Sequence, residues 1–304
     1  MNNSIKDTLT NTASIYGSYL SFNEPLSKHS TIRTGGNAYA WYAPTNLEEL
    51  LETVKFLRKN NIRIVIAGGG SNILFPDGYI DAVFINLSVG YFERIVFDGT
   101  TVTAGSGARL SKLIAESVDN GLSGMEGLIG IPGTVGGAII GNAGHKIEIS
   151  KYLVSVTIID KNNGLHILGK EDISFGYRKS SFTVEDIIVE ASFELAREED
   201  RAILRARLRE YLAGKLKTQP MADKTLGCIF KNPDSIYKSA QLIEMAGLKG
   251  VRKGGAVIST KHSNFIVNDG SATSSDVLAL INVAREEIKS KFNIIIEPEI
   301  KFLD

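Results

Sequence analysis

Cysteine is nearly absent from this chain, which has only Cys228 among its 304 residues. A single cysteine excludes an intrachain disulfide and every site that needs several thiolates, such as a zinc ribbon or an iron–sulfur cluster. Sparse cysteine is also typical of proteins that work in a reducing compartment. We therefore expect a cytoplasmic protein that folds around a hydrophobic core.

Net charge and long apolar runs are lacking as well. The chain has 34 lysine and arginine residues and 34 aspartate and glutamate residues, so its formal net charge at pH 7 is +0. This balance argues against nucleic acid or an anionic membrane as the main partner. No stretch approaches roughly 18 uninterrupted apolar residues, and the N-terminal segment lacks the apolar centre of a signal peptide. We expect neither export nor membrane insertion, and no obligate protein partner is evident.

The histidines give no metal-ligand pattern. His29, His145 and His166 have no carboxylate or cysteine neighbours at the spacing of metal ligands. Because cysteine and histidine clusters build most protein metal centres, we predict no metal site.

Glycine is concentrated in two clusters. Residues 127–144 read GLIGIPGTVGGAIIGNAG and carry no charge. Residues 62–67 form an apolar run typical of a largely buried strand, and they lead into Gly68, Gly69, Gly70, Ser71 and Asn72. Successive main-chain N–H groups at such a turn can form an anion-binding concavity, yet neither cluster matches a standard nucleotide fingerprint. Two interpretations stay open from the residues alone: tight packing of two elements, or a dinucleotide held by a different design.

Five segments taken together are similar to one known family. They are GGGSNIL (68–74), GIPGTVGGAIIGNAG (130–144), GYRKSSF (176–182), GCIFKNP (227–233) and EPEIKFL (297–303). In this order they resemble the UDP-N-acetylenolpyruvoylglucosamine reductases, the flavoenzymes of peptidoglycan precursor synthesis. The resemblance runs from about Asn23 to Leu303. The chain resembles the shorter type II form of the family, because residues 183–264 leave no room for the extra substrate-capping insertion of the longer form.

The resemblance implies an α+β fold in two parts. The first is a two-lobed FAD-binding module of the vanillyl-alcohol-oxidase (PCMH) type at 23–196, with lobes at about 23–92 and 93–196. The second is a C-terminal α+β substrate-binding domain at 197–304, and residues 1–22 are a polar lead-in.

Hydrophobic periodicity and turn residues predict the elements of these parts. Helices are expected at 47–57, 110–118 and 197–217, and a further helix begins near Thr273. Strands are expected at 38–43, 62–67, 82–87, 94–97, 101–104, 154–159, 165–168, 187–195, 256–259, 264–267 and 294–302.

The resemblance also implies FAD as cofactor and NADPH as co-substrate. The FAD pyrophosphate would lie against both glycine clusters, joined by the segment 105–108. The residues expected to bind FAD are Gly68, Gly69, Gly70, Ser71, Asn72, Gly107, Ile131, Pro132, Gly133, Gly136, Gly137, Asn142 and Gly144.

The implied reaction needs a charge stabiliser and an acid. Hydride addition to an enolpyruvyl ether leaves negative charge beside its carboxylate. Arg178 is the expected stabiliser, since a guanidinium fork matches a carboxylate. Cys228 stands where the family commonly has a proton-donating serine, and a thiol, with an ordinary pKa of about 8.5, is acidic enough to replace it. Glu299 aligns with the second stabiliser or proton-relay carboxylate of the family, and Glu297 is its rival. Substrate contacts are expected from Tyr177, Lys231 and Asn232.

The expected function is NADPH-dependent reduction of UDP-N-acetylglucosamine enolpyruvate to UDP-N-acetylmuramate through bound FAD. Two alternatives stay open at this point. Another FAD-dependent oxidoreductase of the same superfamily would share the glycine clusters, but it has no reason to contain Arg178, Cys228 and Glu299 together. A non-catalytic nucleotide-binding protein would use the glycine clusters only for packing or for holding a nucleotide.

Overall fold

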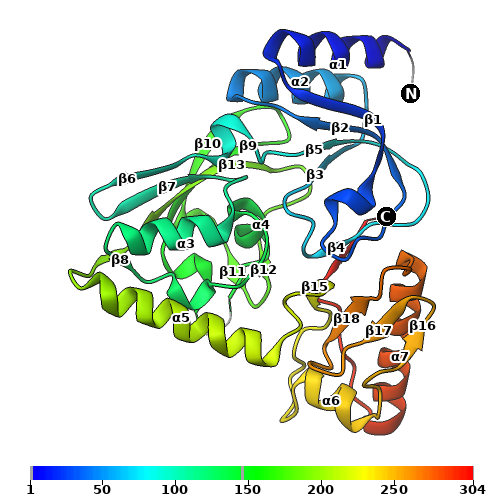
Figure 1. The fold of residues 1–304 in the computed structure, drawn as a ribbon. Coiled ribbons are helices and arrows are strands. Elements are labelled where there is room, and N and C mark those ends of the chain that lie inside the picture. Colours follow the sequence, from blue (N-terminus) through cyan, green and yellow to red (C-terminus); the bar gives the residue numbers. More distant parts are fainter. Residues whose placement is uncertain (1–2, 145–146, 304) are drawn as a thin grey trace. The chain divides into compact units, whose positions relative to one another are not determined.

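The computed structural model describes residues 3–144 and 147–303, which form two compact units (Figure 1). The first unit contains residues 3–24, Ala38–Gly69 and Asp81–Ala213. The second contains Pro25–Asn37, Gly70–Ile80 and 214–303. Each unit is therefore assembled from separate stretches of sequence, and two early segments belong to the second unit. The linear domain limits expected at 22/23 and 196/197 stay predictions.

The first lobe of unit one is a four-stranded sheet in the order β1-β2-β5-β3. Its elements are α1 (Asn3–Tyr16), β1 (Tyr19–Pro25), β2 (Asn37–Ala43), α2 (Leu47–Lys59), β3 (Ile64–Ile66) and β5 (Ile80–Ile85). The helix expected at 47–57 begins as predicted, because the Asn46 side chain accepts the Glu49 N–H at 3.0 Å. Figure 1 shows α1 and α2 side by side over this sheet, and Leu9 and Val54 pack with Val83 in one core. The strand expected at 62–67 spans only three residues and is half-buried.

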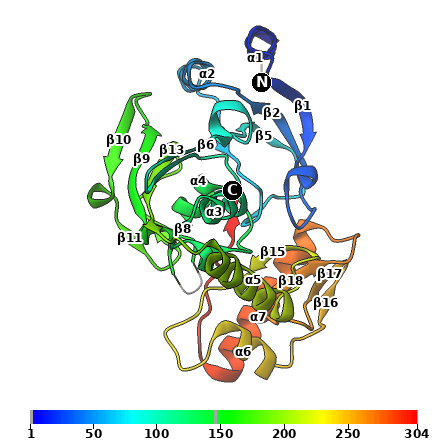
Figure 2. The same cartoon turned by 60° about the vertical axis from the view of Figure 1, so that its left-hand side comes forward.

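The second lobe of unit one is a five-stranded antiparallel sheet in the order β10-β9-β13-β7-β6. Its strands are β6 (Ile95–Asp98), β7 (Thr101–Gly105), β9 (Leu153–Ile159), β10 (Leu165–Gly169) and β13 (Ile187–Glu194). This lobe also contains two short antiparallel strand pairs, β8 (Leu122–Ser123) with β14 (Ala196–Arg197) and β11 (Phe175–Gly176) with β12 (Lys179–Ser180). Its helices are α3 (Leu110–Asp119), α4 (Val135–Ile140) and α5 (Arg201–Thr218). All the strands expected in this region are present, and each end lies within one residue of its expected position (Figure 2).

Helix α4 lies inside the stretch 127–144, where the sequence favoured irregular main chain. Glycines at 136 and 137 have low helix propensity, so local preference does not explain this helix. It is stabilised by packing, because α4 contacts β7 and β13 and its Val135 and Ile139 are fully buried. Thr134 caps it by accepting the Gly137 N–H at 3.5 Å. Packing of α4 against the sheet therefore outweighs the low helix propensity of its glycines.

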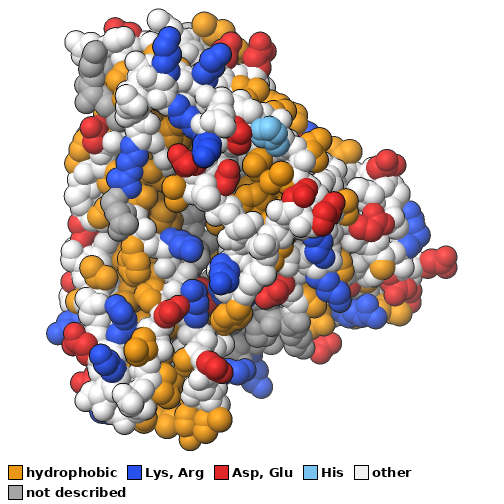
Figure 3. Space-filling model, turned by 180° about the vertical axis from the view of Figure 1, so that it is seen from behind, with side chains coloured by type: hydrophobic (Ala, Val, Ile, Leu, Met, Phe, Trp, Pro, Cys, Tyr) orange, Lys and Arg blue, Asp and Glu red, His pale blue; other side chains and the backbone are white. Residues whose placement is uncertain are grey.

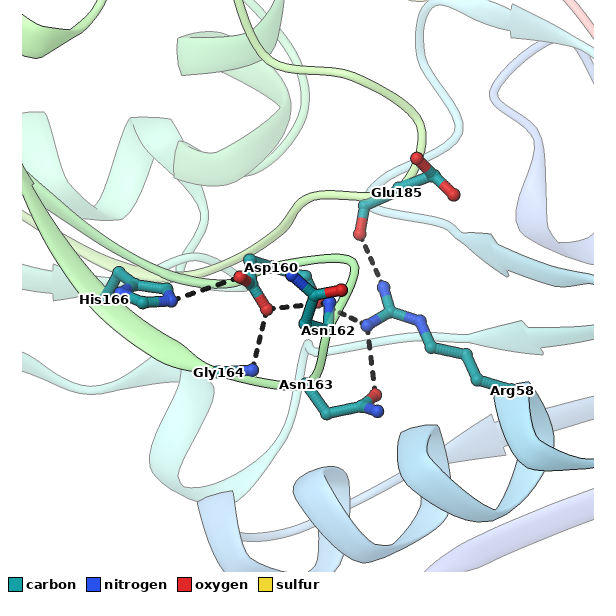
Figure 4. A network of polar contacts seen from close by, with 7 residues as sticks. All are labelled: Arg58, Asp160, Asn162, Asn163, Gly164, His166 and Glu185. Atoms are coloured by element: carbon teal, nitrogen blue, oxygen red, sulfur yellow. Dashed lines mark hydrogen bonds and ion pairs between the residues drawn. The ribbon is translucent and has the colours of Figure 1, made fainter.

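Arg58, on α2, connects the two lobes of unit one (Figure 4). Its guanidinium donates to the Asp160 carbonyl, to Asn163 Oδ1 at 3.1 Å and to the Glu185 carbonyl at 2.5 Å. The Asp160 carboxylate in turn accepts the Gly164 N–H at 2.7 Å and closes the turn between β9 and β10. That bond, with those from Asn162 and His166, holds the pKa of Asp160 below its usual value. One arginine thus fixes the β9–β10 turn of the second lobe to a helix of the first.

The core of unit two is a four-stranded sheet in the order β15-β18-β17-β16. Its elements are β4 (Ile73–Leu74), β15 (Lys224–Cys228), α6 (Ser239–Met245), β16 (Arg252–Lys253), β17 (Ala256–Ile258), β18 (Phe265–Asn268), α7 (Ser274–Phe292) and β19 (Lys301–Phe302). The expectation of a strand over 294–302 is wrong, because only Lys301–Phe302 pairs regularly, parallel to β4. Residues 297–299 run instead as irregular main chain that bonds residue by residue to the segment after β15. Pro298 lacks an N–H and so cannot complete a regular ladder there.

Asp77 fastens an early segment to the last helix within unit two. Its carboxylate accepts the Ser274 N–H at 2.7 Å and the Ser275 N–H at 2.8 Å, both at the start of α7. Burial raises the pKa of Asp77, but the hydrogen bonds from Ser275 and Ser274 outweigh it, and the net pKa lies below the usual value. A carboxyl with a lowered folded-state pKa stabilises the fold above the ordinary pKa of about 3.9 and loses this contribution as pH falls through the folded pKa.

We therefore expect Asp77→Asn to lower the free energy of unfolding by about 1 kcal/mol at pH 7, the size typical of a lost helix cap. The difference from the unchanged protein should shrink as pH falls from 7 toward 3. Urea unfolding across this pH range measures it, with Asp234→Asn, at an exposed carboxylate of the same unit, as control. A difference that stays constant with pH would contradict the assignment.

Candidate active site

The two glycine clusters meet in unit one. A Cβ atom added to Gly69 would lie 3.1 Å from Gly133 Cα, and one added to Gly68 would lie 2.6 Å from Thr134 Oγ1. A side chain at either position would therefore crowd the second cluster, at the Thr134 hydroxyl for Gly68 and at the Gly133 main chain for Gly69. The structure brings together the segment that follows β3 and residues 133–134 of the second cluster, as a shared binding surface would require.

The segment 105–108 lies against the same cluster. The Gly136 N–H donates to the Ser106 carbonyl at 2.8 Å, and the Val135 N–H donates to the Ala108 carbonyl at 2.9 Å. A Cβ on Gly136 would lie 2.9 Å from Ser106 Cβ, and one on Gly107 would lie 1.6 Å from the Leu87 carbonyl oxygen. Gly107 is therefore required for packing inside the protein, whatever else the segment binds.

Several polar groups around these clusters have no partner within the described residues. The N–H groups of Gly68 and Gly69 donate to no acceptor in 3–144 or 147–303. In the same described ranges, the Ser106 hydroxyl and Asn142 Oδ1 are buried without a hydrogen bond. Burying such groups unpaired costs about 1–3 kcal/mol each. Donors and acceptors left over beside a glycine surface fit a bound dinucleotide, whose phosphates and ring edges would satisfy them.

Several of the remaining residues expected to bind FAD form hydrogen bonds within their own unit. In unit one, the Ile131 N–H donates to the Leu128 carbonyl at 3.1 Å, Pro132 and Gly133 follow it, and Gly144 forms a bridge to Glu148. In unit two, the Gly70 carbonyl accepts the Thr31 N–H at 3.0 Å. Ser71 follows, and Asn72 Nδ2 donates to the Glu299 carbonyl at 3.3 Å. Asn72 thus also anchors the segment that carries a predicted catalytic carboxylate.

Arg178 lies in the two-residue turn between β11 and β12, beside Tyr177. Its φ of 57° is in the left-handed region that arginine rarely adopts. Nη2 donates to the Gly144 carbonyl at 2.6 Å, and the guanidinium carbon lies 5.1 Å from the centroid of the Tyr177 ring. The Tyr177 side chain is 45% exposed. The predicted stabiliser is therefore held in a defined place at the end of the second glycine cluster.

In unit two, Cys228 and Glu299 lie on neighbouring segments. Cys228 ends β15, directly after Gly227 with its φ of 79°, and it is half-buried. The next residue, Ile229, accepts the Glu299 N–H on its carbonyl at 2.7 Å. The chain thus brings two of the three predicted catalytic residues together across one main-chain hydrogen bond.

The rival carboxylate Glu297 has a different environment. Its side chain is 72% exposed and pairs with Lys231 Nζ at 3.5 Å. Its carbonyl also accepts the Lys231 N–H at 2.9 Å. Glu299 is half-buried. Lys231 is thus fixed at its main chain, and Asn232 is held through its side chain, whose Oδ1 accepts the Ser239 N–H at 3.2 Å.

Sequence reasoning missed two residues that shape the site. One is Ser106, whose unpartnered hydroxyl lies beside Gly136. The other is Asn264, which donates to the Phe230 carbonyl at 2.8 Å and accepts the Phe230 N–H at 2.9 Å. Asn264 thereby holds the chain that carries Cys228 and Lys231. No motif marks either residue, since a lone serine or asparagine has no sequence signal of its own.

The part of the chain that the structure describes has neither a cluster of metal-ligating side chains nor a helix that could span a membrane. No group of three or more His, Cys, Asp or Glu side chains there is placed to hold a metal ion. His145 lies outside the described residues. None of the described helices is long and apolar enough to cross a bilayer. Figure 3 shows lysine and arginine interspersed with aspartate and glutamate over the face in view.

Comparison with known proteins decides the family. Residues 219–303 match the C-terminal domain of UDP-N-acetylenolpyruvoylglucosamine reductase, and residues 39–168 match an FAD binding domain. The reductase of Desulforamulus reducens is 35% identical over 285 residues, which cover 93% of both chains. This chain belongs to the UDP-N-acetylenolpyruvoylglucosamine reductase family. The family, the FAD cofactor and the oxidoreductase class predicted from the sequence are confirmed.

Other members of this reductase family agree in length and in fold. The reductase of Chloroherpeton thalassium is 38% identical and covers 91% of each chain. The crystal structure of the reductase from Thermus caldophilus superposes with a TM-score of 0.80 at 32% identity, covering 94% of this chain and 99% of that one. The α+β fold with an FAD-binding module and a C-terminal domain is thus confirmed as well.

Proposed function

We propose that this chain reduces UDP-N-acetylglucosamine enolpyruvate to UDP-N-acetylmuramate with NADPH, in peptidoglycan precursor synthesis. The names of its relatives support the substrate. The observation that supports the proposal for this chain's own residues is the main-chain hydrogen bond from Glu299 to Ile229, because it joins the segment of Glu299 to the segment of Cys228. We further propose that the reaction takes place in the cytoplasm, in keeping with the low cysteine content of the sequence.

FAD would be held by the two glycine clusters. When bound, it would supply the hydride-transfer chemistry between NADPH and the enolpyruvyl double bond. In unit one, the free N–H groups of Gly68 and Gly69 and the hydroxyl of Ser106 would serve as its hydrogen-bond donors. Gly133, Gly136 and Gly137 have no side chains, so the cofactor could approach the main chain closely at these positions.

Arg178 would bind the enolpyruvyl carboxylate. A guanidinium presents two parallel N–H donors, which match the two oxygens of a planar carboxylate. The interaction strengthens as negative charge moves onto the carboxylate oxygens, so it favours the transition state over the bound substrate. Tyr177, exposed in the same turn, would contact the substrate beside it.

Cys228 would donate the proton that completes the reduction, at the carbon next to the carboxylate. The thiol proton moves to that carbon, and Sγ is left as a thiolate that solvent reprotonates. We assign the role of second stabiliser or proton-relay carboxylate to Glu299 rather than Glu297, because Glu299 is half-buried whereas the Glu297 side chain is 72% exposed. Lys231 and Asn232 would contact the nucleotide part of the substrate.

A turnover assay tests the proposal. The purified, FAD-loaded protein should oxidise more than one equivalent of NADPH only when UDP-N-acetylglucosamine enolpyruvate is present, and mass spectrometry should find a product two mass units heavier. NADPH oxidation that depends on oxygen and not on this substrate would overturn the proposal.

Ser106→Ala is expected to weaken FAD binding by roughly 3- to 10-fold, the effect of one lost hydrogen bond. The same change should not destabilise the apoprotein, because the hydroxyl has no partner in the described residues. FAD titration by fluorescence and thermal unfolding of the apoprotein measure the two effects. Ser117→Ala is the control, since Ser117 Oγ is buried and donates to the Leu113 carbonyl at 2.7 Å. Equal FAD affinity in the Ser106 and Ser117 variants would sink the assignment.

A further inference from the structure

The hairpin that carries Arg178 is too small to hold its own shape. It pairs only Phe175 with Ser180 and Gly176 with Lys179. Even a longer isolated two-stranded hairpin is marginally stable in water. The left-handed conformation of Arg178 adds a cost of about 1–2 kcal/mol. Something outside the hairpin must therefore fix the direction of the guanidinium.

Three hydrogen bonds fasten this hairpin to the end of the second glycine cluster, residues 140–144. Ser180 Oγ donates to the Ile140 carbonyl at 2.9 Å. Asn142 Nδ2 donates to the Gly176 carbonyl at 3.0 Å. Arg178 Nη2 donates to the Gly144 carbonyl at 2.6 Å. The three bonds hold both strands of the hairpin and the arginine itself, all within unit one.

Asn142 is itself held rigidly. Its residue is 0% exposed, and Nδ2 also donates to Glu148 Oε2 at 2.9 Å. The amide nitrogen is therefore fully used inside the protein, which leaves only Oδ1 for a ligand. Residues 140–144 continue directly from α4, and α4 is anchored by Thr134 and by the sheet.

We propose that Ser180 and Asn142 are positioning residues for the reduction of the substrate, acting through the hairpin main chain on Arg178. The proposal rests on the role proposed above for Arg178. The segment that ends the flavin-binding cluster thereby fixes the residue that binds the substrate carboxylate. A guanidinium displaced by about 1 Å can lose on the order of 100-fold in rate.

Rapid-mixing kinetics of Ser180→Ala test this. The rate at which NADPH bleaches the flavin bands should stay within about twofold of the unchanged protein. The rate at which substrate restores those bands should fall by about 10- to 100-fold. Ser123→Ala is the matched control, because Ser123 Oγ also donates to a carbonyl of unit one, that of Ala196 at 3.2 Å. It should leave both rates unchanged, and a Ser180→Ala protein with an undiminished second rate overturns the proposal.

A double-mutant cycle separates positioning from direct contact with substrate. Adding Ser180→Ala to Arg178→Ala should cause no further loss, because the residue that Ser180 positions is already gone. A full additional loss would mean that Ser180 acts on the substrate itself, which contradicts the proposal. An undiminished substrate reaction in Arg178→Ala alone would instead refute the role of Arg178, so the two failures can be told apart.

Discussion

Arg178→Ala is expected to slow reduction of the substrate by about 100- to 1,000-fold, the loss typical when one preorganised donor to a developing anion is removed. Flavin reduction by NADPH should proceed nearly as before, because no enolpyruvyl carboxylate takes part in it. The physical reason is that the Arg178 guanidinium gains interaction energy only as charge moves onto that carboxylate. Rapid-mixing absorbance at the flavin bands measures the two half-reactions separately.

Two further variants make the Arg178 result specific. Arg178→Lys keeps the charge but loses the planar fork, so its rate should lie between those of arginine and alanine. Arg205→Ala removes an exposed arginine of the same unit, which pairs with Asp119 at 2.8 Å, and it should leave both half-reactions unchanged. If Arg178→Ala reduced the substrate at the original rate, the carboxylate would be bound by another group.

Cys228→Ala should keep flavin reduction by NADPH and lose substrate reduction by about 100- to 10,000-fold, the range for a missing general acid. Cys228→Ser should stay active, because a hydroxyl can occupy the same position and donate the same proton. The two variants together distinguish loss of a proton donor from loss of a small buried side chain, since serine and alanine fill similar space.

The pH profile gives a second test of the Cys228 role. A free thiol ionises with a pKa of about 8.5, and a thiolate can no longer donate a proton. Activity that depends on the thiol should therefore fall at high pH, whereas the Cys228→Ser protein should not lose activity over that range. Identical alkaline limbs in both proteins would contradict a proton-donating Cys228.

The sequence predicted the parts of the fold that depend on local pattern. The helix at 47–57 has an asparagine cap and regular apolar spacing, and the strands of the second lobe are β-branched runs. It did not predict α4, because Gly136 and Gly137 disfavour a helix and only burial against β7 and β13 stabilises it. Composition could not foresee this, since the stabilising contacts come from residues far away in the chain.

The residues of the candidate site could be predicted from sequence motifs, but their contacts in the fold could not. Motifs identified Arg178, Cys228 and Glu299 by their order in the sequence, and their roles stay predictions. Motifs could not show that Glu299 bonds to Ile229, or that residues 70–80 join the second unit. Those facts depend on long-range main-chain pairing, for which a single sequence has no signal. Ser106 and Asn264 were not predicted for the same reason. The role of each depends on residues that lie beside it only in the folded chain.

The most direct test of the account is one anaerobic absorption experiment on the FAD-loaded protein. NADPH is added first, and UDP-N-acetylglucosamine enolpyruvate follows. We predict that the flavin bands bleach with NADPH and return in full when the substrate is added. Bands that bleach and stay bleached after the substrate is added would contradict it.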